Sequence, residues 1–317
     1  MKIIILLLLM TGCTAALAAQ VAINHDGSLP DASSMLEVNS NNKGFLPPRM
    51  NTTQRDAIDS PAEGLLIYNT TTNCLQWFNR SLWFDLCQGS VTPGPESDCS
   101  TPGFIAPFLT ADETAVVDVN NPVTGDTWMD RNLGAMTDAR SSADCWAYGN
   151  LYQWGRASEG HEDRSSGITS SNATTAVPNA GNSWDGLFIT EHDSPYDWLS
   201  PQVGTLWQGV SGTNNPCPAG YRLPTETELN NERLSWVQPP INSTNTSAGA
   251  YASPLKLPVA GARTRWNGVL SSVGSYGYYW SSTVNGGSSW HLNFSSGDAY
   301  MGSNYRAYGF AIRCLKD

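Results

Sequence analysis

Two short clusters of imidazole and carboxylate side chains are the residues of this chain best suited to hold a metal ion. They are His161–Asp163 and Glu191–Asp193. Histidine nitrogens and carboxylate oxygens are ordinary ligands of transition metals. Both clusters stand in polar stretches rich in Ser, Gly and Asn, where charged side chains are usually solvated. We therefore expect both clusters to lie at the surface, and we expect no metal site.

Catalytic motifs are missing from the sequence. It contains no HExxH helix and no GxSxG elbow, and no arrangement of Ser, Asp and His singles out a nucleophile with its base. Asn24–Ser28 lacks the full spacing of an EF-hand calcium loop, so a turn at Asp26-Gly27 is expected there. The sequence predicts a protein that is not an enzyme and that uses no cofactor.

The first residues predict export. Lys2 precedes the apolar run Ile3–Met10, and Ala16–Ala18 fits a signal-peptidase site, so residues 1–19 are expected to be a signal peptide. The run is too short to be a membrane span. A second interpretation takes Met10–Cys13 as a lipoprotein box in which Cys13 is lipidated. Both place the protein outside the cell or on its surface.

Six cysteines remain after the signal peptide. They are Cys74, Cys87, Cys99, Cys145, Cys217 and Cys314. An even number of cysteines in an exported chain predicts disulfides. No CxxC pair occurs, which argues against a zinc site or a redox dithiol. Cys74 and Cys87 bracket two expected strands and are the simplest pair.

The composition of the chain argues against nucleic acid as a partner. The 317 residues include 17 Lys and Arg against 28 Asp and Glu, a net charge of -11, whereas nucleic-acid binding needs clustered basic side chains. Only 14% of residues are charged, and the abundant Asn, Ser, Thr and Gly favour strands and turns over long helices. Most of the twelve Trp are expected in a core, while exposed Trp and Tyr suit sugar or protein recognition.

Residues 20–88 are expected to form a β-rich module. The expected elements are strands at Met35–Val38, Gly64–Asn69, Cys74–Phe78 and Leu82–Leu86, and a helix from Thr52 or Thr53 through Ile58 with a Thr cap. The motifs here are Ala22–Asn24, Lys43–Met50, Gln54–Ile58 and Gly64–Asn69. They resemble the leader modules of Bacteroidetes surface proteins and phage tail fibres. In fibres such modules help to form trimers, so the resemblance implies a homo-oligomer.

A linker rich in Gly, Pro and Ser is expected at residues 89–107, followed by a second domain at 108–317. Residues 124–133 suggest a hairpin turn and then a strand. Ser158–Trp207 has little periodicity and is expected to be a long surface loop. Thr225 as N-cap and Glu228 as its capping-box partner predict a helix that continues to about Trp236.

The last 61 residues, from Leu257, combine a rigid frame with a polar and aromatic stretch. The apolar residues Trp290, Leu292 and Phe294 alternate with the polar residues Ser289, His291 and Asn293. This period of two predicts a strand with one buried face. Phe310, Ile312 and Cys314 repeat the alternation near the end. Between them, Ser295–Tyr308 has the composition of a recognition loop.

The motifs of the second domain resemble a known family. They are Trp128-Met129, Asn132-Leu133, Tyr148–Arg156, Cys217–Thr225, Gly277–Ser282 and Gly309–Cys314. Their order is that of the Fibrobacter succinogenes major paralogous domain, which is similar to C-type lectin-like and formylglycine-generating-enzyme-like folds. The resemblance implies an α+β domain with short helices around twisted antiparallel sheets. It also implies a Cys217–Cys314 disulfide, which leaves Cys99 and Cys145 as a pair by subtraction.

Two activities of these folds are not expected here. The related oxidases use a cysteine pair near the C-terminus, where this chain has only Cys314. The calcium-binding signatures Glu-Pro-Asn and Trp-Asn-Asp of many C-type lectins are also missing, and Trp290–Asn293 is only a loose echo of the second.

The terminal segment also resembles the variable region of proteins diversified by retroelements, including phage receptor-binding proteins with a C-type lectin fold. The resemblance implies that its exposed positions contact a ligand. The expected contact residues are Ser289, His291, Asn293, Ser295, Asp298, Tyr300, Ser303, Asn304, Tyr305 and Tyr308. The three tyrosines are expected to be exposed anchors, with Arg306 as a charged contact and with Trp280 and Trp290 packed beneath. The alternative is a set of ordinary turn residues without programmed variation.

The sequence thus predicts an exported, disulfide-linked binding or adhesion protein. Its β-rich module would attach or oligomerise it, and its lectin-like domain would recognise a protein or glycan at a surface. The alternative is a structural subunit of an extracellular appendage or filament, in which the same loops contact neighbouring copies.

Overall fold

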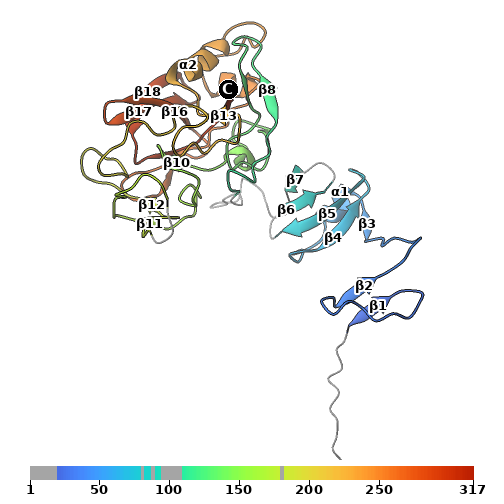
Figure 1. Ribbon diagram of the computed structural model, residues 1–317. Helices are drawn as coiled ribbons and strands as arrows, with labels where there is room; N and C mark the ends of the chain where they lie inside the picture. Colours follow the sequence, from blue (N-terminus) through green and yellow to red (C-terminus); the bar gives the residue numbers. More distant parts are fainter. Residues whose placement is uncertain (1–19, 80–81, 87–89, 94–108, 179–181) are drawn as a thin grey trace, which may run out of the picture.

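The computed structural model describes residues 20–79, 82–86, 90–93, 109–178 and 182–317 (Figure 1). Strands are numerous and mostly short, and helices are few, which is consistent with the expected α+β class and equally with a mostly β fold. In the described part of the chain, no helix is long and apolar enough to cross a membrane.

The first described residues form two separate sheets. Strands β1 (Val21–Ile23) and β2 (Leu36–Val38) pair in parallel. A five-stranded sheet follows with the order β3-β4-β5-β6-β7. Its strands are β3 (Arg49–Met50), β4 (Leu66–Asn69), β5 (Cys74–Asn79), β6 (Leu82–Asp85) and β7 (Ser90–Pro93). The strands expected from the sequence are therefore present, and β7 extends the sheet into the stretch expected to be a linker.

Helix α1 (Thr52–Asp56) begins at Thr52, the earlier of the two expected positions, and ends before the expected Ile58; its cap is Asn51 and not a threonine. The Asn51 side chain accepts the Gln54 N–H, and the Gln54 side chain accepts the Asn51 N–H, which makes a complete capping box. Asn is at least as good an N-cap as Thr. The predicted threonine cap is wrong.

The five-stranded sheet has a small core of its own. Ile67, Phe78 and Trp83 are buried against one another, with Met50, Ile58 and Leu65 packed around them. Buried Arg55 donates to Gln76 Oε1, which also accepts from Asn69, so the polar groups of this core satisfy each other.

Residues 109–317 contain two four-stranded antiparallel sheets, one three-stranded antiparallel sheet and one two-stranded parallel sheet. The first has the order β13 (Tyr221–Arg222), β20 (Leu315–Lys316), β9 (Thr127–Met129), β8 (Asp118–Asn120). The second has the order β10 (Tyr152–Gln153), β19 (Gly309–Phe310), β14 (Ala262–Arg263), β15 (Leu270–Ser271). The others are β16 (Gly277–Asn285) with β17 (Ser288–Phe294) and β18 (Ala299–Tyr305), and β11 (Ile168–Thr169) with β12 (Phe188–Ile189). The hairpin expected at residues 124–133 is the β8–β9 turn.

The helix expected at Thr225 is confirmed. Helix α2 (Glu226–Ser235) has Thr225 as N-cap and Glu228 as its capping-box partner, and its C-cap is Trp236. It lies against β16, β17 and β18, as Figure 1 shows. The other helices here are short: η1 (Cys145–Ala147) and α3 (Ser247–Ala252).

Ser158–Trp207 is not the surface loop that the sequence suggests. It has little regular structure, but Trp184, Trp198 and Trp207 are buried in the core of residues 109–317. The segment shows little hydrophobic periodicity because single aromatic side chains, spaced irregularly along it, are buried, and no helix or strand presents a continuous apolar face. The prediction of a surface excursion is wrong.

Tryptophan N–H groups hold these irregular segments together. Trp280, Trp198 and Trp207 donate to the backbone carbonyls of Tyr152, Trp154 and Arg156, over 2.8, 2.7 and 3.0 Å. In return, the Trp154 indole donates to the carbonyl of Ser281. Four backbone carbonyls therefore accept hydrogen bonds from buried indole side chains.

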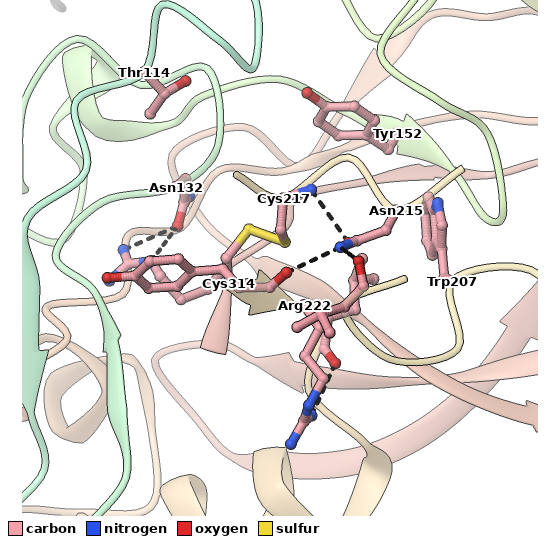
Figure 2. The surroundings of a disulfide bond; sticks show 12 residues. Thr114, Asn132, Tyr152, Trp207, Asn215, Cys217, Arg222 and Cys314 are labelled. Atoms are coloured by element: carbon pink, nitrogen blue, oxygen red, sulfur yellow. Dashed lines mark hydrogen bonds between the residues drawn. A yellow bond between two sulfur atoms is a disulfide. The ribbon is translucent and has the colours of Figure 1, made fainter. Parts of the chain in front are cut away.

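The implied Cys217–Cys314 disulfide is present and joins residues 97 positions apart (Figure 2). It lies beside the pairing of β13 with β20, and Asn215 braces it by accepting the Cys217 N–H and donating to the Tyr221 carbonyl. Cys74 and Cys145 are also disulfide-bonded. Their expected partners, Cys87 and Cys99, lie outside the described residues.

The last residues do not form one alternating strand. Phe310 ends β19, and Leu315 begins β20 in a different sheet, so Phe310–Leu315 passes between two sheets and is buried on both sides. Arg313 is buried too, and donates to Asn132 and to the carbonyls of Met129 and Leu255. The buried guanidinium of Arg313 is thus satisfied by a side-chain amide oxygen and two backbone carbonyls.

Replacing both Cys217 and Cys314 by Ala should lower the free energy of unfolding by about 4 kcal/mol, because the disulfide closes a long loop in the unfolded chain. Denaturant unfolding followed by tryptophan fluorescence measures this loss. A loss below about 1 kcal/mol would mean that packing around β13 and β20 already restricts the two ends.

Candidate functional site: a tyrosine-rich face

The candidate site is built on the three-stranded sheet of β16, β17 and β18. Partner residues of antiparallel strands point to the same side of a sheet. One side therefore carries Tyr278, Trp280, Ser289, His291, Asn293, Tyr300, Gly302 and Asn304. Half of the expected recognition loop Ser295–Tyr308 is thus strand β18, which pairs with β17 over its whole length. This corrects the prediction of a loop.

The polar residues of β17 are buried rather than exposed. Ser289, His291, Asn293 and Ser295 are each less than 9% exposed. The His291 ring packs against Phe310, Trp280 and Tyr278, with ring centroids 4.9 to 6.1 Å apart. Phe310, from another sheet, covers this side of β17. The expectation of a strand with one solvated face is wrong, and these four side chains are not surface contacts.

His291 is neutral near pH 7. Burial lowers the pKa of its imidazole to about 4. Its Nδ1 and the neighbouring Asn293 Oδ1 are buried without a hydrogen-bond partner, while Asn293 Nδ2 donates to the Tyr300 hydroxyl over 3.2 Å. Gly302 lies opposite His291, where an added Cβ would approach the His291 ring to 3.1 Å. A small residue in β18 leaves room for the imidazole.

The remaining expected contact residues divide between the surface and structural roles. Tyr300 is 48% exposed and Tyr305 39%, as expected for anchors, and Tyr308 is half-buried. Ser303 is exposed but pairs with Trp290 on the opposite side of the sheet. Asp298 accepts the Ser295 hydroxyl in the turn before β18, and Asn304 accepts the Tyr305 N–H.

Aromatic side chains from other segments extend the exposed surface. We call the tyrosine face the set Tyr196, Arg265, Trp266, Tyr276, Tyr278, Tyr300, Tyr305 and Tyr308. Ring contacts connect its members: Tyr276 stacks on Tyr278, both Tyr278 and Tyr308 stack on buried Phe310, and Trp266 meets Tyr308 edge-on at 5.7 Å. Sequence reasoning missed five members of this face: Tyr196, Arg265, Trp266, Tyr276 and Tyr278. An aromatic residue beside turn formers, as in Trp266-Asn267-Gly268, is the signal that would have found them.

Arg265 lies among these rings. Its guanidinium is 4.0 Å from the Tyr196 ring centroid and 5.3 Å from that of Tyr305. The Glu191 N–H donates to the Arg265 carbonyl, and the Nη1 group of Arg265 donates to the Glu191 carbonyl. Tyr196 has a φ of +59°, rare for a bulky residue, and its carbonyl accepts the Ala307 N–H. Three distant segments are thereby fixed at one point of the tyrosine face.

Arg306 anchors the turn after β18 from below. It is buried, 3.5 Å from the Asp197 carboxylate, and it donates to Ser289 and to the carbonyls of Val203 and Gly286. Its expected role as an exposed charged contact is therefore wrong. Trp280 is fully buried, as expected of a frame residue, whereas Trp290 is only partly buried.

His161 and Glu162, from the first of the two segments considered for metal binding, belong to a buried ionic cluster. His161 and Glu162 are almost fully buried, so the expectation of surface side chains is wrong here. His161 Nε2 accepts the Gln153 N–H, and its Nδ1 lies 2.7 Å from Glu159, which also pairs with Arg156. Burial opposes ionisation of Glu162, but bonding to His161 prevails and lowers the pKa of that carboxyl to about 2.

Across the described ranges, no three metal-binding side chains stand close enough to share an ion. His192 is exposed, whereas the neighbouring Glu191 carboxylate accepts from Asn172 and from the Asp193 N–H. Glu191, Asp193 and Asp197 line an open polar depression of about 640 Å³. Asp197 accepts the Leu199 N–H and the Gln202 amide there, so local structure accounts for its position.

One comparison with known proteins gives a match, confined to the N-terminal part. Residues 22–98 match the family described as "Phage tail like trimerisation region". No curated protein and no solved structure matches the chain. The match agrees with the resemblance to tail-fibre modules noted above for residues 21–88.

Asp197 should make the protein less stable as the pH rises from 4 to 6. Burial raises the pKa of its carboxyl to about 6 from an ordinary 3.8, although Arg306 opposes the shift. Between these values the folded chain binds more protons than the unfolded chain, so stability falls as pH rises. Over this pH range the contribution of Asp197 should lower the free energy of unfolding by about 3 kcal/mol.

Asp197→Asn should remove this slope. Subtracting the free energies of unfolding of the two proteins at each pH isolates Asp197 from the other carboxylates. The difference should change between pH 4 and 6 and be constant above pH 7. Parallel profiles would show that Arg306 keeps the carboxylate ionised throughout.

Proposed function

We propose that this protein is a homo-oligomeric component of an extracellular appendage, similar in plan to a tail fibre. The match of residues 22–98 to a phage-tail-like trimerisation region is the observation that carries the proposal. Disulfides support an oxidising location outside the cytoplasm. In this plan residues 20–88 assemble the copies, and residues 108–317 form the displayed domain.

A C-type lectin-like fold is our proposal for the displayed domain. Short helices around small antiparallel sheets support it. So does the disulfide between Cys217, which precedes β13 and helix α2, and Cys314, which precedes the last strand. The motifs of the Fibrobacter major paralogous domain belong to this same part of the chain.

Recognition is the role we propose for the tyrosine face, with a protein or a glycan as ligand and without catalysis. Tyrosine offers a large ring and a hydroxyl at little cost in side-chain entropy. Buried Arg306 and His291 hold the face from beneath, so it is formed before a ligand arrives, and that lowers the entropic cost of binding.

The proposed assembly predicts that the full chain has three times the mass of one copy in solution. Multi-angle light scattering after size-exclusion chromatography measures this mass directly. A single-copy mass at every concentration from about 1 to 100 μM would reject the oligomeric appendage and would leave a monomeric binding protein.

The proposed recognition predicts that Tyr300→Ala, Tyr305→Ala and Tyr308→Ala together reduce ligand binding at least tenfold, because exposed aromatic anchors supply most of such binding energy. A printed glycan array, read by fluorescence of the labelled full chain, provides the probe. The melting temperature should fall by only a few degrees, since each of the three tyrosine side chains is at least partly exposed.

Ser303→Ala is the matched control for this experiment. Ser303 lies on β18 and pairs with Trp290, on the side of the sheet opposite Tyr300. Tyr305 pairs with Ser288 on that side too, but its ring reaches that of Tyr196, with centroids 4.5 Å apart. Array signals that persist in the tyrosine variant, or that are lost in the Ser303 variant, would place recognition elsewhere on the molecule.

A further inference from the structure

The strand pair β1–β2 exposes its apolar side. The parallel register aligns Val21 with Leu36 and Ile23 with Val38, so these four side chains share one side. Each is between 43% and 57% exposed. Ala22 and Glu37 occupy the other side, and both are less exposed than the apolar four. In a single chain the apolar side of this strand pair is therefore the more exposed one, whereas strands of soluble proteins normally bury their apolar side.

Nothing within the described chain covers this apolar side. The hydrophobic clusters of the described residues begin at Met50 and include no side chain from residues 20–48. Leu29, Met35, Phe45 and Leu46 are also exposed. Eight large apolar side chains are thus open to solvent within 26 residues, a concentration that marks an interaction surface.

The backbone of this segment is nevertheless regular. The Val21 N–H donates to the Met35 carbonyl, and the Asn39 N–H donates to the Ile23 carbonyl, which extends the pairing at both ends. The Gln20 amide donates to the Ser34 carbonyl, and Glu37 accepts the Asp31 N–H. The connection between the strands is therefore closed by local polar bonds. A two-stranded parallel sheet of three-residue strands is too small to persist in water with both faces open.

A depression of about 580 Å³ lies at one end of the strand pair. Its lining includes Ile23 and Val38 from the apolar side, together with His25 and residues 39–44. This hollow, next to exposed apolar side chains, provides room for side chains from another molecule.

We propose that the apolar side formed by Val21, Ile23, Leu36 and Val38 is the contact through which three copies of this chain assemble. The inference rests on the proposed function and locates its assembly surface. Each copy would place its strand pair against those of two others around a threefold axis, so that the apolar sides form one shared core.

A second copy fits this surface better than a foreign protein does. The four side chains are uncharged and aliphatic, so the surface is complementary to itself without any matching of charges. The match to a trimerisation region begins at residue 22, within β1. The five-stranded sheet has a core of its own, so among the described residues of this region the strand pair is the element whose apolar side lacks a cover within one chain.

The experiment compares the solution mass of the full chain with that of Ile23→Asp and Val38→Asp, each tested alone. A charge in the shared core should raise the concentration for half-assembly by ~100-fold or more, because a buried carboxylate there has no partner. We expect single-copy mass at 10 μM for both variants. Tryptophan fluorescence and far-ultraviolet circular dichroism should be unchanged, because the cores of residues 49–317 are not altered.

Two matched controls separate this contact from general effects of charge. Ala22→Lys adds a charge to the same strand on the opposite side, beside Glu37. Val116→Asp adds one at an exposed valine far along the chain. Both should keep the mass of three copies. Dissociation of either control to the same extent would overturn the assignment.

The outcomes distinguish this inference from the proposed function. A wild-type chain with three-copy mass and variants that keep that mass would overturn the inference alone, and would place assembly in the five-stranded sheet. A wild-type chain that is monomeric throughout would reject both. Dissociation of Ile23→Asp and Val38→Asp, with both controls assembled, would support the inference.

Discussion

Hydrogen bonds from buried indoles to backbone carbonyls are the constraint on which residues 109–317 depend. Most strands in this part are two or three residues long, so strand pairing leaves many carbonyls without a partner. Alternate carbonyls at Tyr152, Trp154 and Arg156 accept from three tryptophans that come from distant segments. Each indole brings a large apolar surface and one donor, so a single residue both fills the core and fixes an irregular backbone. The high tryptophan content is therefore a structural requirement of a fold with little regular pairing.

The same indole hydrogen bonds also make the tyrosine face rigid. Trp280 belongs to β16, and its indole ties the sheet to Tyr152, while its ring lies 4.3 Å from that of Phe310. Phe310 in turn supports Tyr278, Tyr308 and His291. The exposed rings thus rest on a buried aromatic layer that is fixed by hydrogen bonds to the backbone. Recognition by this face, as proposed above, would therefore need little rearrangement of the aromatic side chains.

Local signals in the sequence predicted local structure well. The capping box at Thr225 and Glu228 lies within one turn of chain, and the helix begins where it predicts. The strands of residues 66–85 also follow from alternation and turn residues. Burial could not be predicted in this way, because it depends on what a remote segment places above a strand. Ser289, His291 and Asn293 have the composition of a solvated face, yet Phe310 and Arg306 cover them. His161 and Glu162 were misjudged for the same reason, since a polar loop can fold inward when it carries its own ion pairs.

The outer edge of β18 is occupied at both ends by its own chain. The Ala299 carbonyl accepts from Asn245 and Arg233, and the Tyr305 backbone is engaged by Asn304 and Tyr308. An open edge strand is a template on which further strands can add without limit. These contacts close the two ends of the edge to such growth. Only the short stretch between Ala299 and Tyr305 is then left on which a neighbouring strand could pair.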